Sequence, residues 1–212
     1  MFSTNIAIKI NAEGGDRKAP PHLFVISIPM KFCLQLPFLI LITFVLSGHS
    51  PWGQYHVYRQ KHLLIMSTIQ DEPTYPFSKK LVAVINEVLP HASARPARAK
   101  HFQRVHNLFS TKQMTVMLLS RSNAVAAFNG EGPFAEYGSL DFRLLYQFGD
   151  LQLLGQVDFP DQFAWLVTDA VMRAQSFIEA DAPEVVIELP NLHPGTLIAL
   201  KNEPMPLLPE AM

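Results

Sequence analysis

The sequence contains one cysteine, Cys33, among 212 residues. A single cysteine forms no disulfide within the chain, which excludes the stapled scaffolds of small secreted domains. Cys33 lies at the start of an apolar run that we expect to be removed from the mature protein, and its loss would leave no thiolate nucleophile. A lipoprotein signal has its cysteine at the end of the apolar run, so Cys33 does not fit that role either.

Strong net charge and catalytic motifs are also missing. The chain carries 17 basic and 18 acidic side chains, a net charge of −1, so no overall field favours nucleic acid or an anionic membrane. There is no Gly-x-Ser-x-Gly elbow, no Walker loop, no dinucleotide-binding glycine motif after a strand and no His-Glu-x-x-His pair. We therefore predict a protein that is not an enzyme, uses no cofactor and binds no nucleic acid.

The eight histidines suggest a metal site, but their spacing argues against one. His101 and His106 are five residues apart and fall on different faces of a helix. His56 and His62 point to one face of a strand but lie far from each other, and no carboxylate stands at a matching offset. We predict exposed or hydrogen-bonded histidines and no metal.

An apolar run near the N-terminus is typical of a targeting signal. Lys31 precedes the apolar stretch Phe32–Leu46, and small residues follow it, which gives the three regions of a secretory signal peptide. The stretch has roughly 15 residues, fewer than the ~20 needed to span a bilayer. We predict a signal peptide at 30–53, cleaved between Ser47 and Gln54, and export to a Gram-negative periplasm. Membrane contact would then come only through this segment.

The residues before this signal are unusual because a signal peptide normally begins at its own initiator. Met30-Lys31-Phe32 looks like such a start, so we interpret residues 1–29 as an extension that is not translated. The alternative for the apolar run is an uncleaved anchor or a buried core helix.

After Gln54, short apolar runs alternate with amphipathic segments, which predicts an α/β domain with a mostly parallel sheet flanked by helices. We place this single domain at 55–200 and an extended, proline-containing tail at 201–212. The expected strands are His62–Thr68, Ala92–Pro96, Met114–Ser120, a pair within Phe142–Leu154 that bends at Gly149-Asp150, and Val185–Leu189. The expected helices are Phe77–Leu89, Phe102–Phe109, Asn123–Asn129 and Phe163–Phe177, with Gly130 as a C-terminal cap and Asp161 as an N-cap.

Open α/β sheets bind ligands in the loops at the carboxyl ends of their strands. This rule points to Ser67–Tyr75 and Ser120–Asn123, which follow two of the expected parallel strands. The candidate ligand residues in these loops are Thr68, Thr74, Tyr75, Ser120, Ser122 and Asn123. The acidic pair Asp71-Glu72 is either plain turn chemistry or a cation ligand. The basic run Arg95, Arg98, Lys100 and Arg104 is either a solvated face or a binding surface for an anion or a partner.

Several of these segments together resemble the TAXI-type solute-binding subunits of TRAP transporters. The residues that carry the likeness are Thr74-Tyr75-Pro76, Asn86–Pro90, Asn107-Leu108, Phe128–Phe134 (FNGEGPF), Phe142–Leu145 and Leu192–Thr196. The resemblance implies a periplasmic-binding-protein-like lobe that binds a small organic anion or amino acid and serves a TRAP-type permease. It also adds Glu131 to the candidate ligand residues.

The chain departs from this family in two ways. Family members usually carry a Gly-Gly pair before the tyrosine, whereas this chain has Glu72-Pro73. The family's second lobe, expected between Gln156 and Asp161, has room for only a few residues here. A single lobe cannot close over a ligand by itself. The alternative function is therefore a non-enzymatic accessory protein that docks on another exported protein or associates with its own copy.

Overall fold

The computed structural model describes residues 61–206, all of which belong to one compact unit. The expected extension at 1–29, the expected signal at 30–53 and the end of the expected tail lie outside the described residues.

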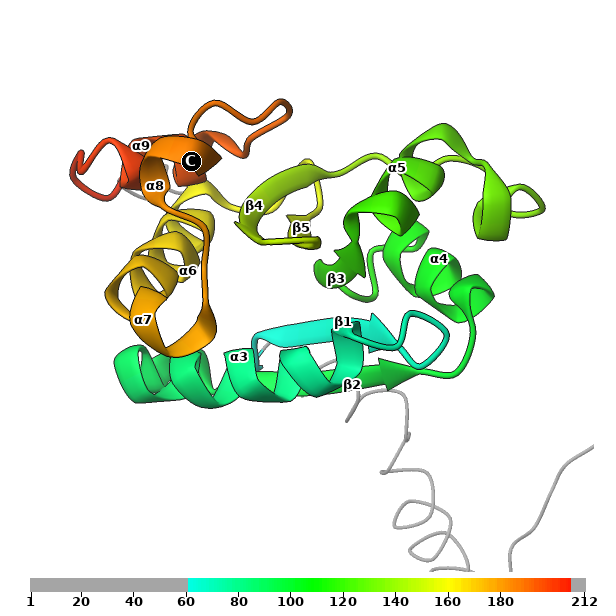
Figure 1. Ribbon diagram of the computed structural model, residues 1–212, viewed down its shortest axis with the longest axis horizontal. Helices are drawn as coiled ribbons and strands as arrows, with labels where there is room; N and C mark the ends of the chain where they lie inside the picture. The colour runs from blue at the N-terminus through cyan, green and yellow to red at the C-terminus, as the bar shows by residue number, and fades with distance from the viewer. Residues whose placement is uncertain (1–60, 207–212) are drawn as a thin grey trace, which may run out of the picture. The chain divides into compact units, whose positions relative to one another are not determined.

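The core of the unit is one five-stranded sheet with strand order β2-β1-β3-β5-β4 (Figure 1). The strands are β1 (Leu64–Thr68), β2 (Arg95–Ala99), β3 (Val116–Ser120), β4 (Arg143–Phe148) and β5 (Leu151–Gly155). β1 pairs in parallel with β2 and β3, whereas β5 runs antiparallel to both β3 and β4. β4 therefore points the same way as β1, β2 and β3, and only β5 is reversed. This arrangement confirms the predicted α/β class with a mostly parallel sheet.

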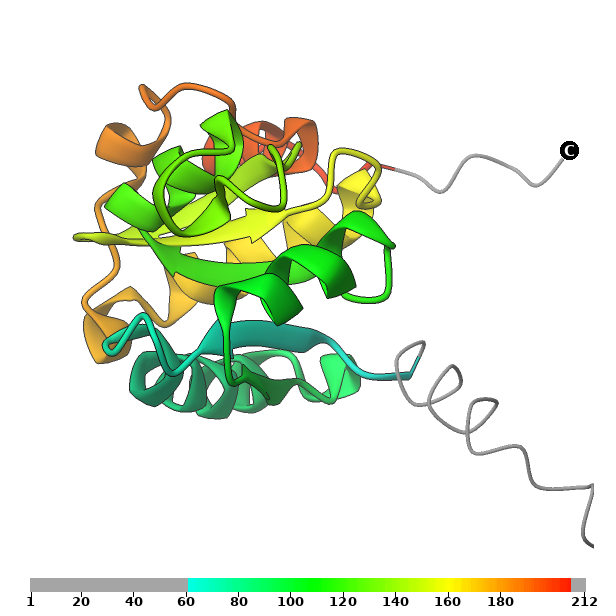
Figure 2. The same ribbon diagram turned by 90° about the vertical axis from the view of Figure 1, so that its right-hand side faces the viewer.

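Helices cover both faces of the sheet (Figures 1 and 2). They are α3 (Thr74–Val88), α4 (Phe102–Ser110), α5 (Arg121–Asn129), α6 (Asp161–Arg173), α7 (Gln175–Ile178), α8 (Pro183–Val186) and α9 (Pro194–Leu200), with short 3₁₀ turns η1 (Pro90–Ala92) and η2 (Gly132–Phe134). Alternate strand residues enter separate cores, because successive side chains of a strand point to opposite faces. Ile65 and Leu118 pack with α3 and α6, whereas Met66 and Leu119 pack with α4 and α5.

Prolines near the start of α3 make its first residue difficult to predict from the sequence. The helix starts at Thr74, earlier than the expected Phe77, with Pro73 as its N-cap residue and Pro76 inside its first turn. A first turn tolerates proline because its N–H groups have no partner within the helix. At the end of α5, Gly130 adopts the expected left-handed conformation with φ of 69°. The predicted N-cap at Asp161 is wrong: Pro160 is the N-cap residue and Asp161 is the first residue of α6.

Two strand predictions differ from the structure because local hydrogen bonds take precedence. β2 starts at Arg95, not Ala92, since Pro90–Ala92 forms a 3₁₀ turn and the Asn86 amide binds both backbone groups of Ala94. Val185–Leu189 is not a strand. Pro183 opens the short helix α8 there, where a first-position proline is favoured.

The expected helix Phe163–Phe177 is divided in two, and the residues at the two ends of its expected apolar face are exposed. α6 ends at Arg173 and α7 follows it. Phe163 and Phe177 are 50% and 69% exposed, so neither belongs to the core. The buried face of α6 consists mainly of small and β-branched residues: Ala164, Val167, Thr168, Ala170 and Val171. Such residues allow α9 to pack closely on α6, and α9 itself was not expected from the sequence.

Candidate functional site

The two predicted ligand loops meet at the carboxyl edge of the sheet, the end at which β1, β2 and β3 finish. The contact is a hydrogen bond from the Ser120 backbone N–H to the Asp71 carboxylate, with 2.8 Å between the nitrogen and Oδ2. These two residues are 49 positions apart in the chain. The parallel pairing of β1 with β3 brings their loops together, as the rule for open α/β sheets leads one to expect.

In the first loop, two of the candidate hydroxyls serve the fold. Thr68 and Thr74 are fully buried. The Thr74 hydroxyl donates to backbone carbonyls in its own loop, at 2.8 Å from the Asp71 oxygen and 3.2 Å from the Thr68 oxygen. The Thr68 hydroxyl accepts from the backbone N–H of Gln70 at 3.3 Å. Both side chains therefore shape the turn into α3.

The polar side chains of the second loop also form hydrogen bonds with one another. The Ser120 hydroxyl lies 3.3 Å from the Ser122 hydroxyl and accepts from the Asn123 amide at 3.0 Å. Ser120 is buried, Asn123 is half-buried and Ser122 is exposed. These three candidates form one small cluster at the beginning of α5, and Ser122 is its most accessible member.

Asp71 is a site residue for which the sequence leaves two roles open, plain turn chemistry or a cation ligand. Asp71 is 5% exposed, and its carboxylate accepts a hydrogen bond from the backbone N–H of Ser120, the N-cap residue of α5. A helix beginning attracts negative charge, so this internal carboxylate takes the position that a solute carboxylate would prefer. No signal in the local sequence reveals this, because the partner of Asp71 comes from a distant strand.

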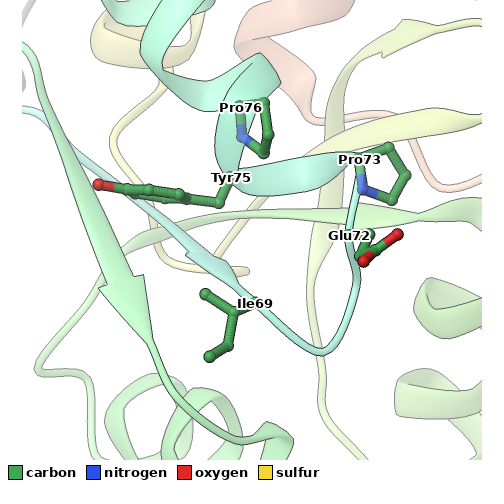
Figure 3. Close-up of a pocket in the computed structure, with 5 residues that line it drawn as sticks. All are labelled: Ile69, Glu72, Pro73, Tyr75 and Pro76. Atoms are coloured by element: carbon green, nitrogen blue, oxygen red, sulfur yellow. The ribbon is translucent and has the colours of Figure 1, made fainter.

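Tyr75 stands beside an open pocket of about 550 Å³ at the same edge (Figure 3). The pocket is lined by Ile69, Glu72, Pro73, Tyr75 and Pro76. The Tyr75 ring points away from the Glu72 carboxylate, so an aromatic surface and an acid lie on different sides of the loop (Figure 3). The walls are mostly apolar, which suits the carbon skeleton of a small solute or an apolar side chain of a partner.

Two cations flank the ring of Tyr75. Lys79 lies one helical turn further along α3, with its Nζ 5.1 Å from the ring centroid. Arg98 of β2 lies 5.5 Å from the same centroid, measured at Cζ. Among residues 61–206, neither cation takes part in an ion pair. The ring of Tyr75, which lines the pocket, therefore lies between two positive charges that can attract an anion.

Glu131 is the candidate that stands apart. It is exposed and follows the end of α5, a helix of nine residues that begins at the Ser120–Asn123 cluster. Nine residues correspond to about 13 Å along a helix axis, so the two ends are well separated. The backbone N–H of Glu131 donates to Ala126, which continues the helix end. Its position supports a role in the turn after α5.

The loop in which the second lobe was expected, 156–161, lies at the opposite end of the sheet from Tyr75. Gln156 donates its backbone N–H to Thr115, just before β3 begins, so the loop to Asp161 lies at the amino ends of the strands. The connection at the carboxyl edge is instead the tight turn Gly149-Asp150 between β4 and β5. A lobe inserted at 156–161 would face away from Tyr75.

Comparison with models of protein families gives no match to this chain, and comparison with curated proteins gives none either. Within the described part of the chain, no group of three or more histidine, cysteine or acidic side chains is placed to hold a metal ion. Over the same residues, no helix combines the length and the apolar character that crossing a membrane requires.

Proposed function

We propose that this chain is an exported, non-enzymatic solute-binding protein, related to the TAXI-type subunits of TRAP transporters, that takes a small organic anion or amino acid beside Tyr75. The observation that carries the proposal is the pairing of an open apolar pocket with two cations, Lys79 and Arg98, held on the ring of Tyr75. A TRAP-type permease would be the partner that receives the solute.

The chemistry of the pocket favours an anion with an apolar body. Ile69 is 46% exposed and, with the neighbouring prolines, offers apolar surface. Arg98 presents a planar guanidinium that binds a carboxylate through two parallel hydrogen bonds. Glu72 repels a second carboxylate on its own side of the loop, so the negative group is expected on the side of Arg98 and Lys79.

A thermal-shift screen of carboxylates and amino acids tests the solute-binding proposal. A solute present at 100 times its Kd raises the free energy of unfolding by about 2.7 kcal/mol. We expect monocarboxylates with an apolar body to raise Tm most, and we expect the Glu72→Gln variant to gain affinity. If no carboxylate shifts Tm at concentrations of tens of millimolar, solute capture by this lobe is wrong.

Two neighbouring lysines provide a matched pair of variants. Lys79→Gln removes a charge that sits on Tyr75, whereas Lys80→Gln removes a charge that pairs loosely with Glu179 at 4.0 Å. A charged hydrogen bond contributes about 1.5–3 kcal/mol, so the first variant should weaken carboxylate binding at least about tenfold. The second should leave it unchanged. Equal losses in both variants would show a general charge effect and would contradict the proposed position.

Export is tested separately from binding. The full chain with a C-terminal tag would be expressed in a Gram-negative host, and the periplasmic fraction would be analysed by mass spectrometry of the N-terminus. Export predicts a mature protein whose first residue lies between Gly48 and Gln54. A protein that stays in the cytoplasm with residues 30–53 intact would contradict export without affecting the binding proposal.

A second candidate function is docking on another exported protein or on a second copy. The observation that favours it is the lack of an opposite wall: Ile69 and the prolines beside it stay exposed, and the loop hydroxyls are already bonded within the fold. A sizing column run beside the solute screen separates the two functions. A dimer or a partner complex without any solute-induced shift in Tm would favour docking.

A further inference from the structure

One long edge of the sheet is open in the described part of the chain. At the opposite edge, β4 is covered, because the Leu144 N–H donates to Asn191 at 2.8 Å and His193 donates back to Leu144 at 2.9 Å. β2 pairs with β1 on one side, and no described strand pairs with its other side. An open strand edge presents backbone groups that another chain can bind.

The hydrogen-bond register shows which backbone groups of β2 face outward. Arg95 donates its N–H to Leu63 on the β1 side, and Ala99 accepts there from Ile69. Because strand residues alternate, Arg95, Ala97 and Ala99 face β1, whereas Pro96 and Arg98 face away from it. Proline has no N–H, so the edge offers one donor, at Arg98, and two acceptors, the carbonyls of Pro96 and Arg98. With only three free backbone groups, the edge of β2 resists non-specific strand pairing but can still pair with one specific strand.

Positive charge lines this edge. Arg95, Arg98 and Lys100 are exposed, and the segment 95–100 contains no acidic residue. Within the part of the chain that the structure describes, none of these three cations forms an ion pair. The charges of Arg95 and Lys100 are therefore available to attract a negatively charged strand and to select it over a neutral one, whereas the Arg98 guanidinium already lies over the ring of Tyr75.

We infer that the β2 edge is a docking site for an extended, acidic segment of another protein, which adds to the sheet beside Arg98. Charge disfavours pairing of β2 with the β2 of a second copy, because that would set two rows of cations against each other. An acidic strand would make three backbone hydrogen bonds, to Arg98 and Pro96, and would place carboxylates next to Arg95 on one face of the sheet and next to Lys100 on the other. This surface requires no pocket ligand, so the inference does not depend on solute binding.

Peptide binding to the full chain tests this inference. The probes are three fluorescein-labelled peptides: one of consecutive glutamates, one of consecutive lysines, and the glutamate peptide with every amide N-methylated. Fluorescence anisotropy at low salt should show binding of the first only, since N-methylation removes the donors that pair with the edge carbonyls. Equal binding of the N-methylated peptide would show charge attraction without strand pairing and would overturn the inference, as would no binding of the glutamate peptide.

Two charge reversals locate the binding. Arg95→Glu changes the edge without touching Tyr75, whereas Lys201→Glu makes the same change on the exposed C-terminal end of α9. An exposed ion pair accounts for about a fivefold effect at most, and reversal adds repulsion, so we expect Arg95→Glu to weaken the glutamate peptide about five- to tenfold. Lys201→Glu should leave it unchanged. Circular dichroism would verify that both variants fold, and equal effects in both would overturn the assignment to β2.

Amide hydrogen exchange gives a direct reading of the same edge. In the free protein the Arg98 amide should exchange quickly, whereas the Ala97 and Ala99 amides, which face β1, should be protected. The glutamate peptide should protect Arg98 selectively. An Arg98 amide that stays unprotected with peptide bound would overturn strand addition. An amide protected in the absence of peptide, together with a dimer on a sizing column, would replace the acidic partner by a second copy.

Discussion

Substitution of Gly195 by alanine tests how α9 is held against α6. Gly195 is buried in the first turn of α9, and a Cβ added there would lie 2.0 Å from the carbonyl oxygen of Asp161. The same Cβ would lie 2.7 Å from the Asp161 carbonyl carbon and 2.8 Å from its Cα. All three atoms belong to the backbone of α6, so rotation of a side chain cannot relieve the overlap. The two helices must move apart by more than 1 Å, which loosens the buried contact between Thr168 and Thr196 at 3.0 Å.

Two opposing effects decide the size of the Gly195 prediction. Alanine favours the helical backbone over glycine by about 1 kcal/mol. Overpacking of a tight contact costs about 1–3 kcal/mol, and loss of the buried hydroxyl pair adds about 1 kcal/mol. We expect Gly195→Ala to lower the free energy of unfolding by about 2 kcal/mol, a large part of the stability of a domain of this size.

Urea unfolding followed by circular dichroism measures this difference. Gly155→Ala is the matched control, because the three atoms nearest to its added Cβ all belong to the side chain of Leu145, the first of them at 3.1 Å. We expect a loss below about 1 kcal/mol in the control, since a side chain can shift by a few tenths of an ångström. A Gly195→Ala variant as stable as the parent, or more stable, would refute the close contact between α9 and α6.

Three further substitutions address buried polar groups. Asp71→Asn should lower the free energy of unfolding by about 1–2 kcal/mol in urea titrations, because a charge-assisted bond to the Ser120 N–H becomes a neutral one. Burial holds the pKa of His193 below its ordinary 6.5, against the opposing effect of Asp161, so stability is present above pH 6.5 and is lost as pH falls below it. His193→Asn keeps a side-chain acceptor for the N-cap of α9. It should reduce the loss of unfolding free energy between pH 7 and pH 5, measured by urea titration, and an unchanged loss would contradict the role of His193. Burial, with the charge of Asp181 as a smaller cause, raises the pKa of Tyr146 to about 12, so stability is complete below pH 10 and falls above it. Tyr146→Phe should reduce that alkaline loss and should cost about 1 kcal/mol at pH 7, because its hydroxyl donates to the Asp181 carbonyl.

The sequence predicts the buried strands well because their side chains carry the signal. β1 and β3 are short apolar runs, and the structure buries all of β3 and most of β1. β2 was displaced by several residues because Arg95–Ala99 contains two arginines, a proline and two alanines and is only partly buried. An edge strand has one exposed side, so its position depends on backbone pairing with β1, which no local pattern records.

The last helix and the carboxylate at the loop edge were missed for related reasons. Pro194 and Gly195 look like helix breakers, yet proline suits the first position of α9 and glycine is needed for the approach to α6. Asp71 looks like one of two turn acids, yet only Asp71 is buried while Glu72 is exposed. In each case the deciding contact joins residues far apart in the chain, so local propensity points to the wrong role.

The position of the tight turn between β4 and β5 shows where the chain could accept an inserted segment at the carboxyl edge. A two-lobed binding protein closes its second lobe over the loops at the carboxyl edge, so the chain must leave and re-enter the first lobe there. In this structure that edge holds β4 and β5 joined by Gly149-Asp150, with the Gly149 N–H donating to Asp181 at 2.8 Å. The loop at 156–161 lies at the far end, where Asp158 pairs with Lys112. The turn at 149–150 is therefore the connection at which an inserted segment would reach the carboxyl edge, and beside it the Gln147 amide donates to the Asp181 carboxylate at 2.7 Å. Insertion of a flexible Gly-Ser segment at 149–150 should then be tolerated with little loss of Tm, whereas the same insertion within β3 should abolish folding.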